Sequence, residues 1–302
     1  MDNRITKSRL ATFITYDFIK VIAVMLALCV MLLVVFNAVG DKPTSAQTFY
    51  VLCDNEIIVG DDGGMLTVDT AKKGANNGGF SYDIIEVSTK PIETSAYGTS
   101  YMLKTSAELG DDDIFITQEK LGREYLDSYF ATDIVGFVDK AFQYCTDNDF
   151  FSKSGTINEE KIRNYFLKTR KKDNRFRFGK TEEGVALEIQ RIKTIWDNAT
   201  VLKKVFTEHS EIFSDKFTSF TWGGREITGS FAIDLSKLTG GAVLSNAFKF
   251  AIKNQETGEI TSYTSDGIYL FVGNNQDVNG DLDYESLAYI RTIIEKYSNF
   301  IS

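Results

Sequence analysis

The chain has 302 residues, a formal net charge of −9 and 43% hydrophobic residues, which is enough apolar material for one large core or two small ones. An acidic surface repels nucleic-acid phosphates, so the composition argues against a DNA- or RNA-binding role. The chain holds one histidine, which argues against His-based metal clusters and Ser-His-Asp arrangements. We therefore expect neither a metal site nor a cofactor.

Near the start, residues 21–36 form an unbroken run of 16 apolar residues. With its margins the segment covers 18–39, and a helix of this length rises about 33 Å, close to the thickness of a bilayer core. Four cations precede the run, and only Lys42 follows it closely, so the N-terminus is expected on the cytoplasmic side. The predicted organisation is a cytoplasmic tail (1–17), a transmembrane anchor in contact with the lipid bilayer (18–39), a linker (40–47) and an extracytoplasmic domain (48–302).

A cleaved signal peptide is the alternative for this segment. Ala38-Val39-Gly40 offers a small-x-small cleavage site, although the apolar run exceeds the usual length of a signal-peptide core. The length favours an uncleaved anchor, and a bacterial plasma membrane suits it best. Cleavage after Gly40 stays open.

The start of the domain is predicted to be β-structure. Strands are expected at 49–53 and 56–59, a turn at 61–64, a short strand at 65–68 and a half-buried strand at 80–87. A helix is then expected at 97–109, followed by a buried strand at 114–117. The later strand candidates are 217–222, 230–235, 248–253 and 267–272.

Helices dominate the middle of the domain, over about 118–213. Asp133 is the expected N-cap of one helix, Thr156 and Glu159 form a capping box for the next, and 181–209 carries the longest apolar stripe at steps of three and four. A final helix is expected from about residue 283. The predicted fold class is α/β or α+β, with a mixed sheet and a helical middle section.

A basic cluster lies between two of these helices and places seven cations in 13 residues. Such a cluster in an acidic domain suits contact with lipid headgroups, an anionic polymer or an acidic protein face. A solvated loop between helices is the alternative. The cluster comprises Lys168, Arg170, Lys171, Lys172, Arg175, Arg177 and Lys180.

Three acidic segments could carry chemistry. The segment 277–283 resembles the first half of a calcium loop, but it has Leu282 where that loop has glycine and Ala288 where it has the final acid. We therefore interpret it as a polar turn and expect no metal there. Carboxylates also cluster at 61–62 and 111–113, where exposed turns are the common explanation and acid/base chemistry the alternative.

Trp222 and Arg225 flank a Gly-Gly turn. This aromatic and this cation could line a ligand pocket, or they could form a hairpin whose tryptophan belongs to the core. They are the candidate ligand-binding residues. Cys53 and Cys145 could form one disulfide or could both be buried thiols.

Two stretches resemble extracytoplasmic solute-binding proteins of the type 2 periplasmic-binding fold. One runs from Ser100 to Thr117, a helix that leads through an acidic turn into a buried strand. The other is the strand at 267–272 with the loop and helix after it. The resemblance covers about 50 residues and implies a two-lobed cleft and binding without catalysis, whereas the hairpin expected at the start departs from it.

Three functions remain open from the sequence. The first is a non-catalytic, solute-binding-like receptor or accessory subunit beside a membrane transporter. The second is a structural or assembly protein that binds another protein of the cell envelope, and the third is a surface hydrolase. Nucleophile and base signatures are absent from the sequence, so the hydrolase ranks last and the chain is not expected to be an enzyme.

Overall fold

The structure is a computed structural model that describes residues 7–8, 18–39, 48–73, 78–81, 86–92, 99–110, 112–152, 154–169, 181–254, 256–274 and 284–301. The chain divides into two compact units, residues 1–43 and 44–302. The first unit contains helix α2 (Phe18–Val39), whose described side chains, those of Phe18 and residues 20–34, are exposed. Within the described part of the chain, no helix is long and apolar enough to cross a membrane. The membrane segment expected at 18–39 stays a prediction.

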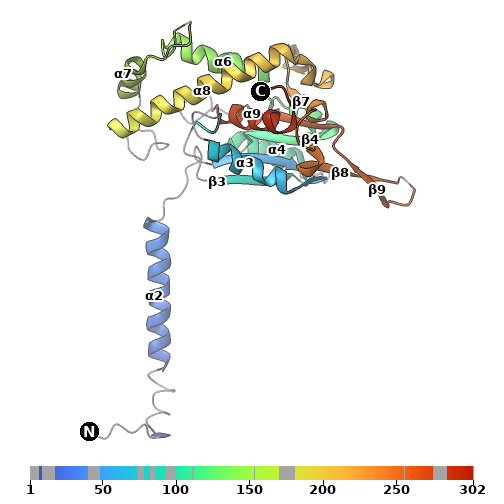
Figure 1. Ribbon diagram of the computed structural model, residues 1–302. Helices are drawn as coiled ribbons and strands as arrows, with labels where there is room; N and C mark the ends of the chain where they lie inside the picture. The colour runs from blue at the N-terminus through green and yellow to red at the C-terminus, as the bar shows by residue number, and fades with distance from the viewer. Residues whose placement is uncertain are drawn as a thin grey trace. The chain divides into compact units, whose positions relative to one another are not determined.

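The second unit is built on a five-stranded mixed sheet (Figure 1). Strand β1 is parallel to β3 and β4, whereas β10 runs antiparallel to both of its neighbours, β4 and β7. The predicted mixed α/β class is therefore confirmed. The strands, in sheet order, are β3 (Glu86–Ile92), β1 (Thr48–Asp54), β4 (Ile114–Gln118), β10 (Ile268–Val272) and β7 (Ala232–Asp234).

Strand β10 is buried on both faces of this sheet. All five of its side chains are buried, which suits an uninterrupted apolar run in a central strand. Its side chains alternate, so Leu270 and Val272 join one hydrophobic core while Tyr269 and Phe271 join the other. The sheet thus separates two cores, and β10 contributes to each.

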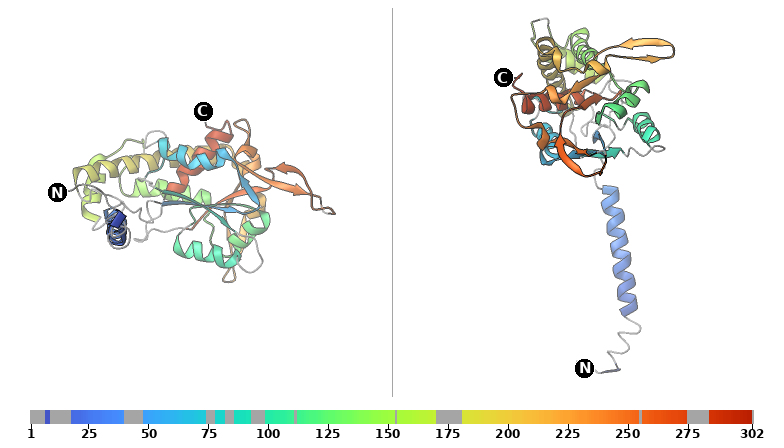
Figure 2. Two further views of the ribbon diagram at one scale, coloured as in Figure 1. Left: turned by 90° about the horizontal axis from the view of Figure 1, so that it is seen from below. Right: turned by 90° about the vertical axis from the view of Figure 1, so that its right-hand side faces the viewer.

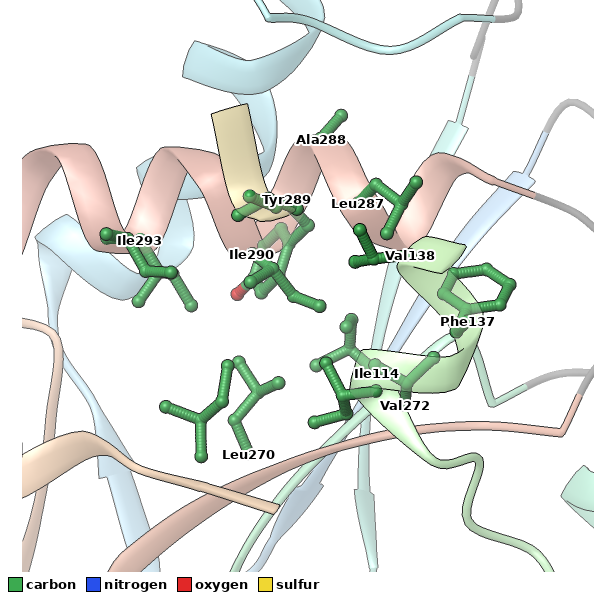
Figure 3. Packing of buried hydrophobic residues seen from close by; sticks show 14 of the residues in the cluster. Ile114, Phe137, Val138, Leu270, Val272, Leu287, Ala288, Tyr289, Ile290 and Ile293 are labelled. Carbon is green, nitrogen blue, oxygen red and sulfur yellow. The ribbon is translucent and has the colours of Figure 1, made fainter. Parts of the chain in front are cut away.

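Helices cover both faces of the sheet (Figure 2). On one face, side chains of α6 and α9, among them Val138 and Ile290, gather against β4 and β10 (Figure 3). On the other face α5 comes close to β10, because a side chain at Gly122 would meet the ring of Phe271. The first face is covered by α3 (Asp61–Lys73), α6 (Ile134–Asp147), α8 (Glu182–Glu208) and α9 (Glu285–Tyr297), and the second by α4 (Thr99–Leu109) and α5 (Glu119–Asp127).

Two small sheets and several short elements complete the unit. One sheet has the order β2-β8-β9 and the other is the hairpin β5–β6. Their strands are β2 (Ile57–Val59), β8 (Phe248–Lys253), β9 (Ile260–Thr264), β5 (Ser219–Trp222) and β6 (Arg225–Thr228). The remaining helices are α7 (Glu159–Thr169) and the 3-10 turns η4 (Ser210–Ile212), η5 (Asp215–Phe217), η6 (Leu235–Lys237) and η7 (Leu244–Asn246).

The helical middle section is confirmed, since α5 to α8 follow one another between β4 and β5. Asp133 caps α6 as predicted, because its carboxylate accepts a hydrogen bond from the Gly136 amide at 3.2 Å. Thr181 caps α8 by accepting from the Gly184 amide at 3.2 Å. These side-chain acceptors satisfy amides that would otherwise lack partners in the first turn of each helix.

The expectation for 61–68 is wrong, because these residues belong to helix α3 and not to a turn and a strand. Acids in the first turn and lysines in the last turn both complement the helix dipole. Leu66 and Thr70 lie one helical turn apart and are buried. The five-stranded sheet therefore begins with a strand, a helix and a parallel strand. The hairpin expected at the start of the domain, which was the point of difference from solute-binding proteins, is not present.

Three further expectations need correction. Helix α7 is capped by Asn158, whose side chain accepts from the Lys161 amide at 3.1 Å, so Thr156 is not its cap. The strand expected at 80–87 lies later, at 86–92, and β9 was not predicted. Residues 44–302 form one compact unit, so the two lobes implied by the resemblance are not separate units.

A buried ion pair lies inside α8. The Arg191 Nε and Glu188 Oε2 atoms are 3.0 Å apart, and both side chains are almost fully buried. The Tyr144 hydroxyl lies 3.2 Å from the same guanidinium. The two side chains depend on each other, because either charge alone would be buried away from water without a counter-ion.

We predict that Arg191→Met destabilises the unit by about 3–5 kcal/mol, because Glu188 would keep a buried charge without its counter-ion. The double variant Glu188→Leu/Arg191→Met should lose less of the free energy of unfolding, since it removes both charges together. Urea unfolding of residues 44–302 measures both. A single variant as stable as the double variant would contradict the prediction.

Candidate functional site

The candidate site lies on the β5–β6 hairpin. Gly223 and Gly224 have φ of +57° and +77°, the positive values that a tight two-residue hairpin turn needs and that glycine adopts without strain. The register pairs Trp222 with Arg225 directly across the hairpin. The two residues predicted to bind a ligand are thus adjacent, at the end of an exposed ribbon.

Trp222 is not a core residue. Half of its surface (50%) is exposed, and its ring stacks on Tyr129 with centroids 5.7 Å apart and planes 19° apart. Tyr129 is itself 42% exposed and also contacts Phe220, at 5.7 Å. We call Tyr129, Trp222 and Arg225 the aromatic shelf.

Tyr129 has a backbone conformation that a tyrosine rarely adopts. Helix α5 ends with hydrogen bonds from Tyr129 N to Leu126 O (2.9 Å) and from Phe130 N to Tyr125 O (3.3 Å), which is the Schellman pattern of helix termination. The residue after the cap then takes a positive φ, and glycine usually occupies that place. Tyr129 takes it with φ of +62°, although left-handed backbone costs roughly 1–2 kcal/mol for a residue with a Cβ atom.

The same ending occurs on α6 with a more tolerant residue. Asp149 has φ of +56° there, and aspartate visits this region more readily than an aromatic residue. Backbone strain of this kind gathers at functional sites. The strained position of Tyr129 therefore favours a role for its ring at the surface.

The shelf rests on a rigid base. Phe220 is 2% exposed and contacts Phe231 edge to face at 5.3 Å, and both rings belong to the core that includes Phe271. This buried base holds the Trp222 ring in a fixed position. Preorganised aromatic groups lose little entropy on binding.

The chemistry of the shelf suits macromolecular contact. Tryptophan, tyrosine and arginine are the residues that most often dominate binding energy at protein interfaces. A hairpin end presents them outward, whereas small-molecule sites are usually concave and bury most of the ligand. The shelf therefore has the composition and the exposure that are typical of residues in protein interfaces.

Sequence reasoning found Trp222 and Arg225 but missed Tyr129. The missing signal was the end of α5, where the sequence Asp127-Ser128-Tyr129 lacks the glycine that usually follows a helix. A helix predicted to end there without glycine could have drawn attention to the residue. Its stacking on Trp222, about 90 positions later, has no sequence signature.

The basic cluster is largely outside the described residues. Lys168 lies in the last turn of α7 and is exposed. The other six members, within 170–180, lie outside the part of the chain that the structure describes, as does the calcium-like segment 277–283. Contact with an anionic surface therefore stays a prediction.

Two of the clustered carboxylates have structural partners. Asp113 Oδ2 accepts a hydrogen bond from the Tyr50 amide at 2.6 Å, and Asp112 Oδ2 accepts one from the Tyr125 hydroxyl at 2.7 Å. Burial and the neighbouring Asp112 raise the pKa of Tyr125. Within the described residues no group of three or more His, Cys, Asp or Glu side chains could hold a metal ion.

An open depression lies at the turn before α7. It has a volume of about 630 Å³ and includes Phe151, Ser152 and Lys161 in its lining. Its aromatic wall is already engaged, because Phe151 stacks on Trp196 with centroids 4.3 Å apart, and Lys161 pairs with Asp149 at 3.2 Å. These contacts support the local fold.

Comparison with protein-family models, with curated proteins and with solved structures finds no match to this chain.

The cysteines of the second unit are free, buried thiols. Cys53 and Cys145 form no disulfide, so the buried-thiol alternative holds. Burial raises the pKa of each thiol to about 12. Since the thiolate is the reactive form, both are inert at neutral pH.

We predict that neither thiol of folded residues 44–302 reacts with iodoacetamide at pH 8, where only about one thiol in ten thousand would be ionised at such a pKa. Mass spectrometry before and after unfolding in urea checks this, with two adducts expected only in urea. Modification of the folded unit at the rate of a free thiol would contradict it.

We predict that Trp222→Ala changes the free energy of unfolding by less than about 1 kcal/mol, because half of the side chain already contacts water. The neighbouring Phe220→Ala, at a buried position, should cost about 3–5 kcal/mol. Urea unfolding of both variants makes the comparison. Equal losses of unfolding free energy in the two variants would mean that the Trp222 side chain stabilises the fold.

Proposed function

We propose that the chain is a membrane-tethered, non-catalytic recognition protein whose extracytoplasmic domain binds another protein of the cell envelope. The aromatic shelf is the contact surface in this proposal. The observation that carries it is the stacked, half-exposed pair Tyr129 and Trp222, which is held by a strained backbone and a buried base. Exposed aromatic residues that lie side by side on a surface often belong to a site of contact with another protein.

The tether is supported by residues 18–39. Their apolar run and the cations before it favour a helix that spans a membrane with the N-terminus in the cytoplasm. The large exposed side chains of α2, such as Leu26, Met31 and Leu33, suit a lipid environment. In this proposal the anchor holds the chain in the membrane and raises the effective concentration of its domain toward other membrane proteins.

Solute binding is the second candidate, and one observation favours it. The order β3-β1-β4 places a topological switch point between β1 and β4, where open α/β sheets usually bind ligands. Asp54 and Thr117 meet there, with Oδ2 and Oγ1 3.2 Å apart. A solute at 100 times its dissociation constant would stabilise the domain by about 2.7 kcal/mol, so a thermal-shift screen with sugars, amino acids and peptides tests this candidate.

We predict that Trp222→Ala and Arg225→Ala each weaken partner binding, by about 2 kcal/mol or roughly 30-fold for an interface hot spot. A photo-reactive amino acid in place of the exposed Glu226, next to the shelf, identifies the partner of the full chain in membranes, and titration of the purified partner then gives the affinities. Leu109→Ala is the matched control, since Leu109 is 66% exposed and lies on α4. Unchanged affinity of both shelf variants would overturn the proposal.

A further inference from the structure

The aromatic shelf occupies one face of the β5–β6 hairpin, which projects from the body of its unit (Figure 2). The register pairs Trp222 with Arg225 and Thr221 with Glu226, and side chains alternate between the two faces of a strand. Trp222 and Arg225 therefore share the face on which Tyr129 stacks, whereas Thr221 and Glu226 lie on the other face. The hairpin contributes an aromatic ring and a cation to the shelf, and no acid.

The polar groups of the shelf are mainly hydrogen-bond donors. The Trp222 indole and the Arg225 guanidinium can only donate, and the Tyr129 hydroxyl can donate or accept. Within the described part of the chain, none of these three side chains makes a hydrogen bond or an ion pair. Asp127, two positions before Tyr129, is already paired with Arg123 at 3.0 Å. A complementary partner must therefore supply acceptors.

A proline-rich segment has the composition that this donor set requires. It adopts the polyproline II helix, whose backbone carbonyls make no internal hydrogen bonds, and proline itself has no N–H group. Such a segment presents many acceptors and few donors, which is the complement of the shelf. Its apolar rings also pack on flat aromatic side chains, and grooves lined by aromatic residues recognise proline-rich chains in this way.

The shallowness of the shelf also favours a partner that is ordered before it binds. Trp222 is 50% exposed and Tyr129 is 42% exposed, so the shelf offers few contacts to offset the entropy of ordering a flexible chain. The polyproline II helix is already formed in the free segment. On the other side, the buried rings of Phe220 and Phe231 hold the shelf in place. Both sides therefore lose little conformational freedom on binding.

We propose that the aromatic shelf binds a proline-rich segment, in the polyproline II conformation, of another protein of the cell envelope. The inference rests on the proposed function, in which the shelf is a protein-binding surface. Proline rings of the segment pack on the rings of Trp222 and Tyr129. The indole N–H of Trp222 and the guanidinium of Arg225 donate to its backbone carbonyls.

Decaproline is the probe, and the Trp222 ring is the reporter. The chain has two tryptophans, so full-length chain carrying Trp196→Phe keeps Trp222 as its only indole. Decaproline should change the emission of this chain in detergent and should saturate it. It should bind at least about tenfold more tightly than a flexible Gly-Ser peptide of the same length. Absence of saturable binding, or equal binding of the two peptides, would overturn the inference.

Variants in the same background locate the binding. Arg225→Ala should weaken decaproline binding by about tenfold, as for a residue that dominates an interface. Tyr263→Ala is the matched control, since Tyr263 is a half-exposed aromatic residue on β9, and it should bind decaproline like the unaltered chain. Equal affinities of these two variants would place the peptide elsewhere and contradict the proposal.

Tyr129→Gly separates binding from folding. Glycine adopts the positive φ of this position without strain, so the variant should keep the midpoint of thermal unfolding of the full chain and lose decaproline binding. Circular dichroism gives the midpoint. Decaproline binding that survives this change, or loss of the fold, would show that the Tyr129 ring is not a binding surface.

The cross-link to the partner separates a failure of this inference from a failure of the proposed function. The partner peptide attached to the photo-reactive group at position 226 should be rich in proline, as mass spectrometry of the linked product shows. A peptide poor in proline whose protein binds shelf variants weakly would overturn this inference and leave the proposed function in place. Unchanged affinity of the partner for the shelf variants would overturn both.

Discussion

Strand β10 is the constraint on which the rest of the second unit depends. It hydrogen-bonds to β4 on one side and to β7 on the other, and its five side chains fill the middle of both cores. The turn after it leaves no space for a side chain at Gly273, because a Cβ atom there would lie 1.8 Å from the Asp112 carbonyl oxygen. The position of β10 is therefore fixed by backbone contact as well as by packing.

The aromatic shelf is positioned through this strand. Phe217, just before β5, contacts Tyr269 and Phe271 of β10, each with centroids 4.9 Å apart. Tyr125, in the last turn of α5 before Tyr129, contacts Phe271 at 5.8 Å. Both supports of the shelf, the root of the hairpin and the end of the helix, thus contact the ring of Phe271, and the distance between Tyr129 and Trp222 depends on it.

Local chemistry made part of this fold predictable. The cap Asp133 and the apolar stripe of α8 are short-range patterns, so the sequence alone placed α6 and α8. The prediction for residues 61–73 was wrong because Gly63 and Gly64 suggest a turn. The buried contacts of Leu66 instead favour a helix over this segment. The outer strand β9 was not predicted because an exposed strand lacks the alternation of apolar and polar residues by which strands are found. At the candidate site, the Gly-Gly turn indicated that Trp222 and Arg225 lie together. Tyr129 joins them through tertiary packing, which residue spacing in the sequence does not reveal.

The place of β10 in the chain has a consequence for how the protein is made. Residues 268–272 leave the ribosome after more than 260 others, yet they lie in the interior of the sheet between strands that were synthesised earlier. Until then β4 has an open edge, and β7 has no strand partner within the sheet. The domain therefore reaches its final form only after β10 has been synthesised, and its nascent chain presents apolar surface until then.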